Sequence, residues 1–195
     1  MTVDSNGGEP ELVLTAPPEV AAAQFVRTPF RATLGAITQL VANAKTRVVM
    51  GSPFIEFQEV LNAGPIGQAL AAALHRGVNV DLVSTAAALA EIVDDHRIDR
   101  TTSGRLRLFQ PGGNRADERA LGSHAKFCLV DQMHAYLGSA NFTEKGMTRH
   151  LEIGVIVHGA AARRLWDILD VLFRSGYFSE IGGPRAVPGT RKPEN

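Results

Sequence analysis

The chain of 195 residues lacks the composition that is typical of disulfide-linked, strongly basic or membrane-spanning proteins. Its one cysteine, Cys128, excludes an internal disulfide and is typical of the reducing cytosol. Twenty basic and twenty acidic residues give a net charge of zero, so no overall basic signal for nucleic acid exists. The sequence has no apolar run near the roughly 20 residues of a membrane span, no secretory signal and no internal repeat. These absences favour a cytoplasmic globular protein without a membrane anchor.

What is present indicates one folded domain. The apolar share of 45% is ordinary for a globular protein, and the length allows one sizeable core. Apolar spacing predicts helices over residues 29–44, 64–77, 86–93 and 160–175. Strand-like runs lie between and after them, at 46–54, 78–84, 105–109, 124–130, 134–141 and 151–157. This order predicts an α/β protein with α/β/α layers and a mixed sheet.

The ends of the chain differ in composition from the middle. Residues 1–26 are expected to be a partly disordered N-terminal segment, with ELVLT at 11–15 as an edge strand. The folded domain is expected over 27–178, and the glycine- and proline-containing residues 179–195 are expected to form a flexible tail.

The run GSHAKFCLVDQMHAYLGSANFTEKG holds the most informative residues, in the pattern H-x-K-x4-D-x6-G-S-x-N. Side chains alternate along a strand, so His124 and Lys126 share one face, and Ser139 and Asn141 can share a side. A lysine, a hydroxyl and an amide together suit the anionic oxygens of a phosphate. A histidine can attack phosphorus and hold it covalently before water releases it. The pattern therefore predicts phosphoryl-transfer chemistry.

The same pattern, His124 to Asn141, resembles the HKD signature of the phospholipase D superfamily. The resemblance implies a phospholipase D-like α/β/α sandwich over residues 27–178 and a metal-independent phosphodiesterase that needs no cofactor. It makes His124 the nucleophile, with Lys126, Ser139 and Asn141 binding the phosphate. Asp131 is counted among the site residues, but strand parity turns it away from His124. We therefore expect Asp131 to support the site rather than take part in the chemistry.

Glu152 extends the resemblance. The family often shows N-x-E at this point, with the glutamate orienting the nucleophilic histidine. This chain has His150 where the asparagine usually stands, which leaves the role of that asparagine open. A carboxylate bonded to one ring nitrogen would leave the other nitrogen of His124 able to attack.

Three further residues are accessory candidates. Ser52 lies in an S-P-F turn and is either a simple turn residue or a phosphate contact. Arg115 and Arg119 lie in the glycine-rich loop before the motif, where they could hold a polyanionic substrate. For these arginines, ion pairs within a solvated loop, to Asp117 and Glu118, are the favoured interpretation.

Only one motif copy is present, whereas the family's chemistry needs two histidines, one to attack and one to protonate the leaving oxygen. This predicts a homodimeric nuclease with a shared site and a nucleic-acid substrate, DNA or RNA. If one chain were sufficient, His134 or His150 would be the missing acid. A phospholipase or phosphatidyltransferase is the second interpretation. The third is a non-catalytic or partner-dependent subunit, because GSHAKFCLVD, NFTEKGM and ELVLT-x-P are similar to phospholipase D-like proteins of DISARM-type antiphage systems.

Overall fold

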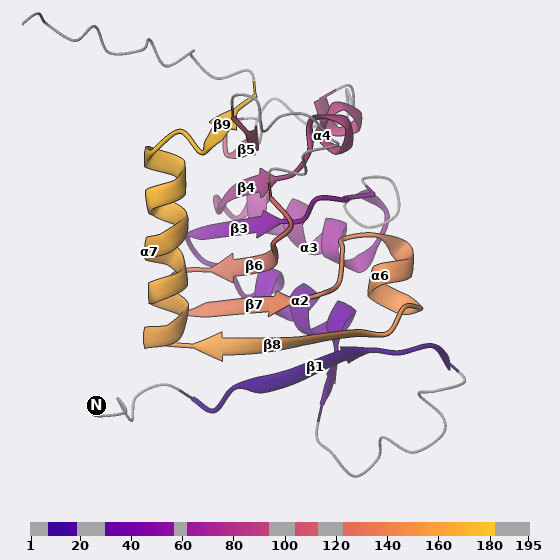
Figure 1. Cartoon of the computed structure of the whole chain (residues 1–195). Coiled ribbons are helices and arrows are strands. Elements are labelled where there is room, and N and C mark those ends of the chain that lie inside the picture. Colours follow the sequence, from indigo (N-terminus) through magenta and orange to yellow (C-terminus); the bar gives the residue numbers. More distant parts are fainter. Residues whose placement is uncertain (1–7, 19–29, 57–61, 94–103, 113–122, 182–195) are drawn as a thin grey trace, which may run out of the picture.

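A computed structural model describes residues 8–18, 30–56, 62–93, 104–112 and 123–181. Within these residues the chain forms a mixed sheet in the order β2-β1-β8-β7-β6-β3-β4-β5-β9 (Figure 1). The strands are β1 (Glu11–Thr15), β2 (Arg31–Ala32), β3 (Arg47–Gly51), β4 (Asn79–Val83), β5 (Leu106–Pro111), β6 (Lys126–Val130), β7 (His134–Gly138), β8 (Glu152–His158) and β9 (Phe178–Glu180). The helices are α2 (Thr33–Ala42), α3 (Pro65–His75), α4 (Ala86–Val93), α6 (Glu144–Thr148) and α7 (Ala160–Arg174).

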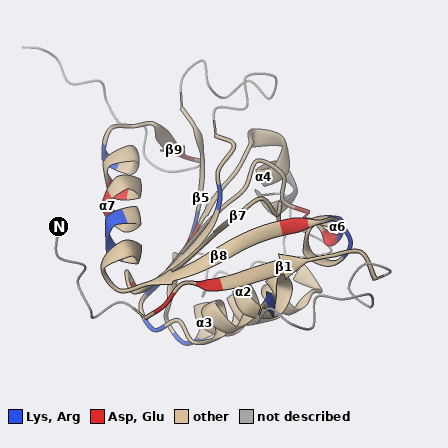
Figure 2. Ribbon diagram, turned by 60° about the horizontal axis from the view of Figure 1, so that its bottom comes forward, with Lys and Arg blue, Asp and Glu red and all other residues tan. Residues whose placement is uncertain are grey.

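Helices lie on both faces of this sheet. Figure 2 shows α7 on one side and α2 and α3 on the other. β3, β4 and β5 are parallel to one another, whereas β6, β7 and β8 form antiparallel pairs. The α/β/α sandwich with a mixed sheet that the sequence predicts is therefore confirmed.

The two faces of the sheet have separate apolar cores. Strand alternation sends Cys128 and Val130 of β6 towards the core with α2 and α3, and Phe127 and Leu129 towards the core with α7. All five residues of β6 are buried, which explains why FCLV, the four residues after Lys126, is a continuous apolar run rather than an alternating one. The strand that begins with Lys126 is thus fixed rigidly in the middle of the molecule.

The ends of the chain differ from the prediction. β1 is not the edge strand, because the two-residue β2 pairs with its outer side. β9 pairs with β5 and extends to Glu180, so the first residues of the expected tail belong to the sheet. The short helix α6 also follows the motif where no helix is predicted.

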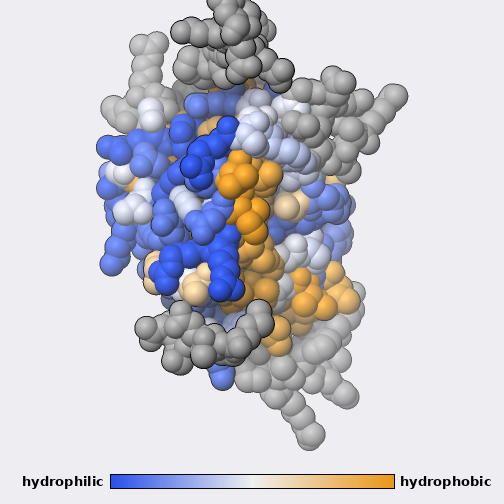
Figure 3. Space-filling model, turned by 60° about the vertical axis from the view of Figure 1, so that its left-hand side comes forward, coloured by the Kyte–Doolittle hydropathy of each residue, from blue (hydrophilic) through white to orange (hydrophobic). Residues whose placement is uncertain are grey.

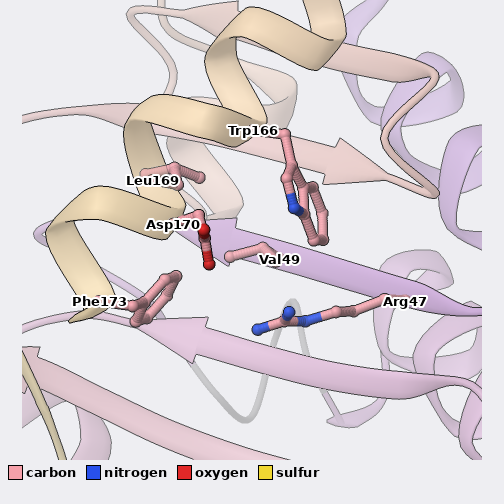
Figure 4. A pocket seen from close by; sticks show the side chains of 6 residues that line it. All are labelled: Arg47, Val49, Trp166, Leu169, Asp170 and Phe173. Carbon is pink, nitrogen blue, oxygen red and sulfur yellow. The ribbon is translucent and has the colours of Figure 1, made fainter.

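An ion-pair cluster lies under α7 at the start of β3, β4 and β5. Asp81 is fully buried, and both Arg47 and Arg107 donate hydrogen bonds to its carboxylate. The Arg47 guanidinium also lies 5.0 Å from the centroid of the Trp166 ring (Figure 4). The hollow beside Arg47 and Trp166 has a volume of about 10 Å³, enough for roughly one water molecule. This cluster therefore joins α7 to the sheet and leaves no space for a ligand.

Candidate active site

The motif residues meet at one edge of the sheet, where β3 and β7 end and β6 and β8 begin (Figure 1). Lys126 of β6 lies opposite Gly138 of β7, which lies opposite Gly154 of β8. His124 comes two residues before Lys126, and Ser139 directly follows Gly138. Residues far apart in the sequence are thus aligned by the register of three adjacent strands.

His124 and Lys126 are in direct contact. The imidazole is exposed, whereas Lys126 is 7% exposed. The Lys126 Nζ atom lies 2.9 Å from His124 Nδ1 and 3.0 Å from the His124 carbonyl oxygen. Because an ammonium has no lone pair, it donates and the ring nitrogen accepts. Burial lowers the pKa of Lys126, and the negative charge of Glu152 opposes this shift. The pair presents a nucleophilic ring beside a confined positive charge.

Glu152 holds Ser139 rather than His124. The Ser139 hydroxyl donates to the Glu152 carboxylate and accepts from the Ile153 amide at 3.1 Å. His150 Nδ1 lies 4.0 Å from the other carboxylate oxygen. Although Glu152 and His124 are both described, no hydrogen bond joins them. The carboxylate therefore orients the motif serine in this structure, and the expected contact with the motif histidine is not formed.

Ser52 positions Asn141 from the end of β3. Its side chain is 2% exposed and donates to Asn141 Oδ1 at 3.0 Å and to the Phe54 carbonyl at 2.9 Å. The carbonyl end of Asn141 is thereby engaged, and its amide end is the donor that it offers to an anionic oxygen. Ser52 is thus a buried residue of the S-P-F turn, and its hydroxyl bonds protein groups.

Tyr136 explains why the motif has a glycine at position 138. A Cβ atom on Gly138 would lie 2.7 Å from Tyr136 Cζ, and closer still to the phenol oxygen. A Cβ atom on Gly154 would lie 2.9 Å from the Leu137 carbonyl oxygen and would also meet the Tyr136 ring. Burial raises the pKa of Tyr136 to about 12, so the phenol remains protonated. Sequence reasoning missed Tyr136, although strand alternation places it on the same face as Gly138.

Asp131 lies at the opposite end of β6 from His124. Its carboxylate accepts hydrogen bonds from the backbone amides of Lys45, Thr46 and Arg47, at 2.8, 2.8 and 2.9 Å. Burial raises the pKa of Asp131, but these hydrogen bonds outweigh it and leave the pKa below its usual value. Asp131 therefore ties the β6–β7 turn to the start of β3, at the end of β6 away from His124.

Arg115 and Arg119 lie outside the described residues. Among the residues that are described, no group of three or more His, Cys, Asp or Glu side chains is placed to hold a metal ion. No helix in the same part of the chain has the length and apolar character to cross a membrane.

An apolar groove opens beside His124 on the α7 face of the sheet. Its volume is about 500 Å³. Ser123, His124 and Ala125 line one end, and aliphatic and aromatic residues of β6, β7, α7 and β9 line the rest. Figure 3 brings this side forward and shows a band of apolar surface beside a polar region.

This fold and this cluster of histidine, lysine, serine and asparagine define a domain of the phospholipase D type. The family described as "Cardiolipin synthase, PLD-like domain" matches residues 37–173, more than half of the chain. The chain therefore belongs to the phospholipase D superfamily of phosphodiester hydrolases.

Among its relatives, the DISARM protein DrmC of Bacillus paralicheniformis is 27% identical over 172 residues, covering 88% of this chain and 66% of DrmC. The human 5'-3' exonuclease PLD4 is 27% identical over 128 residues, 66% of this chain and 24% of that protein. The chain thus spans at most 66% of either relative's length. The phospholipase D family member Nuc of Salmonella typhimurium superposes with a TM-score of 0.56 at 20% identity, covering 89% of this chain and 99% of Nuc.

Proposed function

We propose that this chain is a metal-independent nuclease that cleaves nucleic-acid phosphodiester bonds through a phosphohistidine intermediate. The observation that carries the proposal is the contact of His124 with Lys126 at the sheet edge where Ser139 and Asn141 also lie. The relative that is a 5'-3' exonuclease supports nucleic acid as the substrate. A cytoplasmic location, suggested by the cysteine usage, is part of the same proposal.

The reaction would proceed in two displacements. A ring nitrogen of His124 attacks phosphorus, and the N–P bond forms as the P–O bond to the leaving oxygen breaks. That oxygen takes a proton from an acid. Water then attacks phosphorus, the N–P bond breaks, and the water proton passes to the base that the acid has become. Lys126 and the Asn141 amide stabilise the charge on the phosphoryl oxygens throughout.

The acid is expected to come from a second copy of the chain. Among the described histidines, His134 and His158 lie together at the end of β7 and β8 away from the motif. His75 is the last residue of α3. His150 is 60% exposed and near Glu152, and it is the alternative acid within one chain. A homodimer would supply a second His124 with the same surroundings as the first.

The proposal is tested by incubating the purified chain, with EDTA, against labelled single-stranded DNA, RNA and phosphatidylcholine. We expect cleavage of a nucleic acid, abolished by His124→Ala and nearly so by Lys126→Ala, with unchanged circular dichroism. His75→Ala, an exposed histidine on α3, is the matched control and should retain full activity. Activity that vanishes in EDTA and returns with magnesium would contradict the mechanism, as would normal turnover by His124→Ala.

Two other outcomes would assign different functions. Cleavage of phosphatidylcholine alone would indicate a phospholipase, which the cardiolipin synthase in the family description keeps open. A chain that is active only with added proteins would indicate a partner-dependent subunit, which the similarity to DrmC keeps open.

A further inference from the structure

Phe54 exposes an aromatic ring beside the candidate site. Its side chain is 50% exposed, whereas the next residue, Ile55, is 5% exposed and belongs to the core with α2 and α3. Neighbouring side chains of an extended segment point in opposite directions, so the burial of Ile55 turns Phe54 outwards. Single apolar residues are common on protein surfaces. What distinguishes Phe54 is that its backbone is fixed next to the motif.

The backbone of Phe54 is tied to the motif on both sides. The Ser52 hydroxyl lies 2.9 Å from the Phe54 carbonyl oxygen and 3.0 Å from Asn141 Oδ1. One residue further along, Ile55 pairs in a parallel β-bridge with Phe142, which directly follows Asn141. Phe54 is thus held beside the asparagine that is proposed to bind the phosphate.

A fixed aromatic face next to a phosphate-binding amide suits a nucleotide. One sugar separates the base of a nucleotide from its phosphate, so a phosphate on Asn141 brings the base within reach of the Phe54 ring. Every base has a π-face, and stacking on an aromatic side chain therefore tolerates any base. In a duplex the neighbouring base pairs cover these faces, whereas an unpaired base can stack on a side chain.

We infer that Phe54 is a binding site for an unpaired base, on which single-stranded DNA or RNA stacks beside the phosphate that is cleaved. This inference rests on the proposed function and adds the residue that selects an unpaired strand. Phe54 would contact the substrate without taking part in the displacement at phosphorus.

The charges near Phe54 favour stacking as a source of affinity. The Glu56 carboxylate accepts the Glu144 amide at 2.8 Å, which joins the segment carrying Phe54 to the start of α6, beyond the ends of β3 and β7 (Figure 1). Glu56 and Glu144 thus accompany the basic residues Lys145 and Arg149, and Arg149 is paired with Glu144. Phosphates along this rim meet little net positive charge, in keeping with the zero net charge of the chain. An exposed aromatic face supplies affinity that does not depend on charge.

Binding of short labelled oligonucleotides, measured by fluorescence anisotropy, tests this site. The full chain carries His124→Ala and EDTA is present, so that no strand is cleaved. We expect Phe54→Ala to raise the dissociation constant for single-stranded DNA and RNA by about 10-fold, and Phe54→Trp to preserve it, because a base stacks on either ring. Phe54→Leu retains apolar bulk without a π-face and should resemble Phe54→Ala.

Phe30→Ala is the matched control. Phe30 is 40% exposed and precedes β2 at the outer edge of the sheet, four strands from β6. Its loss removes a second surface phenylalanine and should leave the dissociation constant unchanged. A parent chain that binds none of these strands, or an unchanged dissociation constant for Phe54→Ala, would overturn the inference.

A strand without bases separates stacking from structural damage. An abasic oligonucleotide has the same phosphates, so Phe54→Ala should leave its dissociation constant unchanged while it weakens binding of the strand that carries bases. A duplex of the same sequence should also be little affected, because its base faces are covered. Equal weakening of the abasic and the base-carrying strand would overturn the inference and show that the substitution disturbs the phosphate site.

This inference and the proposed function fail in different ways. A chain that binds single strands through Phe54 but cleaves no nucleic acid would refute the function and keep the base site. A nuclease whose KM is the same with Phe54 and with Phe54→Ala would refute the base site and keep the function. If Phe54→Ala left strand binding unchanged but weakened a dimer or the binding of phosphatidylcholine vesicles, the ring would belong to a protein or lipid contact and the inference would be overturned.

Discussion

At Gly138 the motif needs the absence of a side chain. The Tyr136 ring fills the space that a Cβ atom would occupy, and the Gly154 backbone borders it at 3.0 Å. We expect Gly138→Ala to lower the free energy of unfolding by about 1–3 kcal/mol, as overpacking of a core does, and to displace Ser139. Chemical denaturation and a cleavage assay would measure both effects.

Gly35 provides the control for this substitution. It lies exposed in α2, and a Cβ atom there would meet nothing within 4 Å. Gly35→Ala should raise the free energy of unfolding by about 0.5–1 kcal/mol, because alanine loses less backbone entropy in a helix. If Gly138→Ala were equally harmless, Tyr136 would not be the reason for the glycine.

Asp131 should matter for stability and little for catalysis. Its carboxylate accepts three backbone amides and the Thr46 hydroxyl, and its φ of 52° lies in the left-handed region. Asn tolerates that conformation but loses the charge, so Asp131→Asn should cost about 1–3 kcal/mol of unfolding free energy. The turnover number per folded molecule should stay near that of the wild type. A large loss of turnover in a fully folded Asp131→Asn protein would show that Asp131 takes part in the reaction.

At the scale of elements, a chain of polar contacts joins β7, β8 and β1 at the end away from the site. His134 Nδ1 lies 2.8 Å from His158 Nδ1, and His158 Nε2 lies 2.9 Å from Glu11. Arg31 of β2 donates to the same glutamate. Burial lowers the pKa of His134, and the charge of His158 lowers it further, while Asp131 and Glu11 oppose this.

This junction should lose stability as the pH falls. The folded-state pKa of His134 lies below the ordinary value of 6.5, so the unfolded chain binds the proton first. The contribution of His134 is complete above 6.5 and is lost as the pH falls from 6.5 through the lower folded-state pKa. The pKa of Glu11 is also lowered, chiefly by its hydrogen bond with Arg31, but Glu11 acts only near and below 4.5. Of these two groups, His134 is therefore the one whose protonation falls between pH 7.5 and 5.5.

Melting temperatures at pH 7.5 and 5.5 would measure this effect. We expect His134→Gln to reduce the difference between the two temperatures by about 1–3 °C. His75→Gln, on the surface of α3, should leave the difference unchanged. An unchanged difference in His134→Gln would show that protonation here is not linked to folding.

The longer elements could be predicted because their apolar periodicity extends over several residues. Pro65 and Gly77 bracket α3 as the sequence indicates, with proline at the start and a positive φ at the glycine. The missed elements are the two-residue β2, the three-residue β9 and the five-residue α6, which are too short to have a period. Their formation depends on neighbours that only the folded chain supplies.

The site was predictable in its members but not in its pairings. Alternation alone brings His124 and Lys126 to one face of a strand. Nothing local indicates that Glu152 bonds Ser139, or that buried Ser52 bonds Asn141 across a separation of 89 residues. These contacts depend on strand order, which the sequence pattern does not specify.

At the scale of the whole molecule, a shared site predicts how activity fails on mixing. Wild type and His124→Ala would be unfolded together and refolded at varying ratio, so that mixed dimers form at random. Each chemical step needs both histidines, so mixed dimers should be nearly inactive. Activity should then fall as roughly the square of the wild-type fraction rather than in proportion to it. A linear fall, or an active monomer by light scattering, would direct attention to His150.

The reactivity of the Cys128 thiol can report how often the central strand β6 opens. Cys128 lies in the middle of β6 with 0% exposure, and burial raises the pKa of its thiol to about 12. As the single cysteine of the chain, it should react with a thiol reagent only when the central strand leaves the sheet. The rate of that reaction would report the rate or the free energy of global unfolding without any engineered label. A rate close to that of a small free thiol would show that β6 opens far more easily than its burial implies.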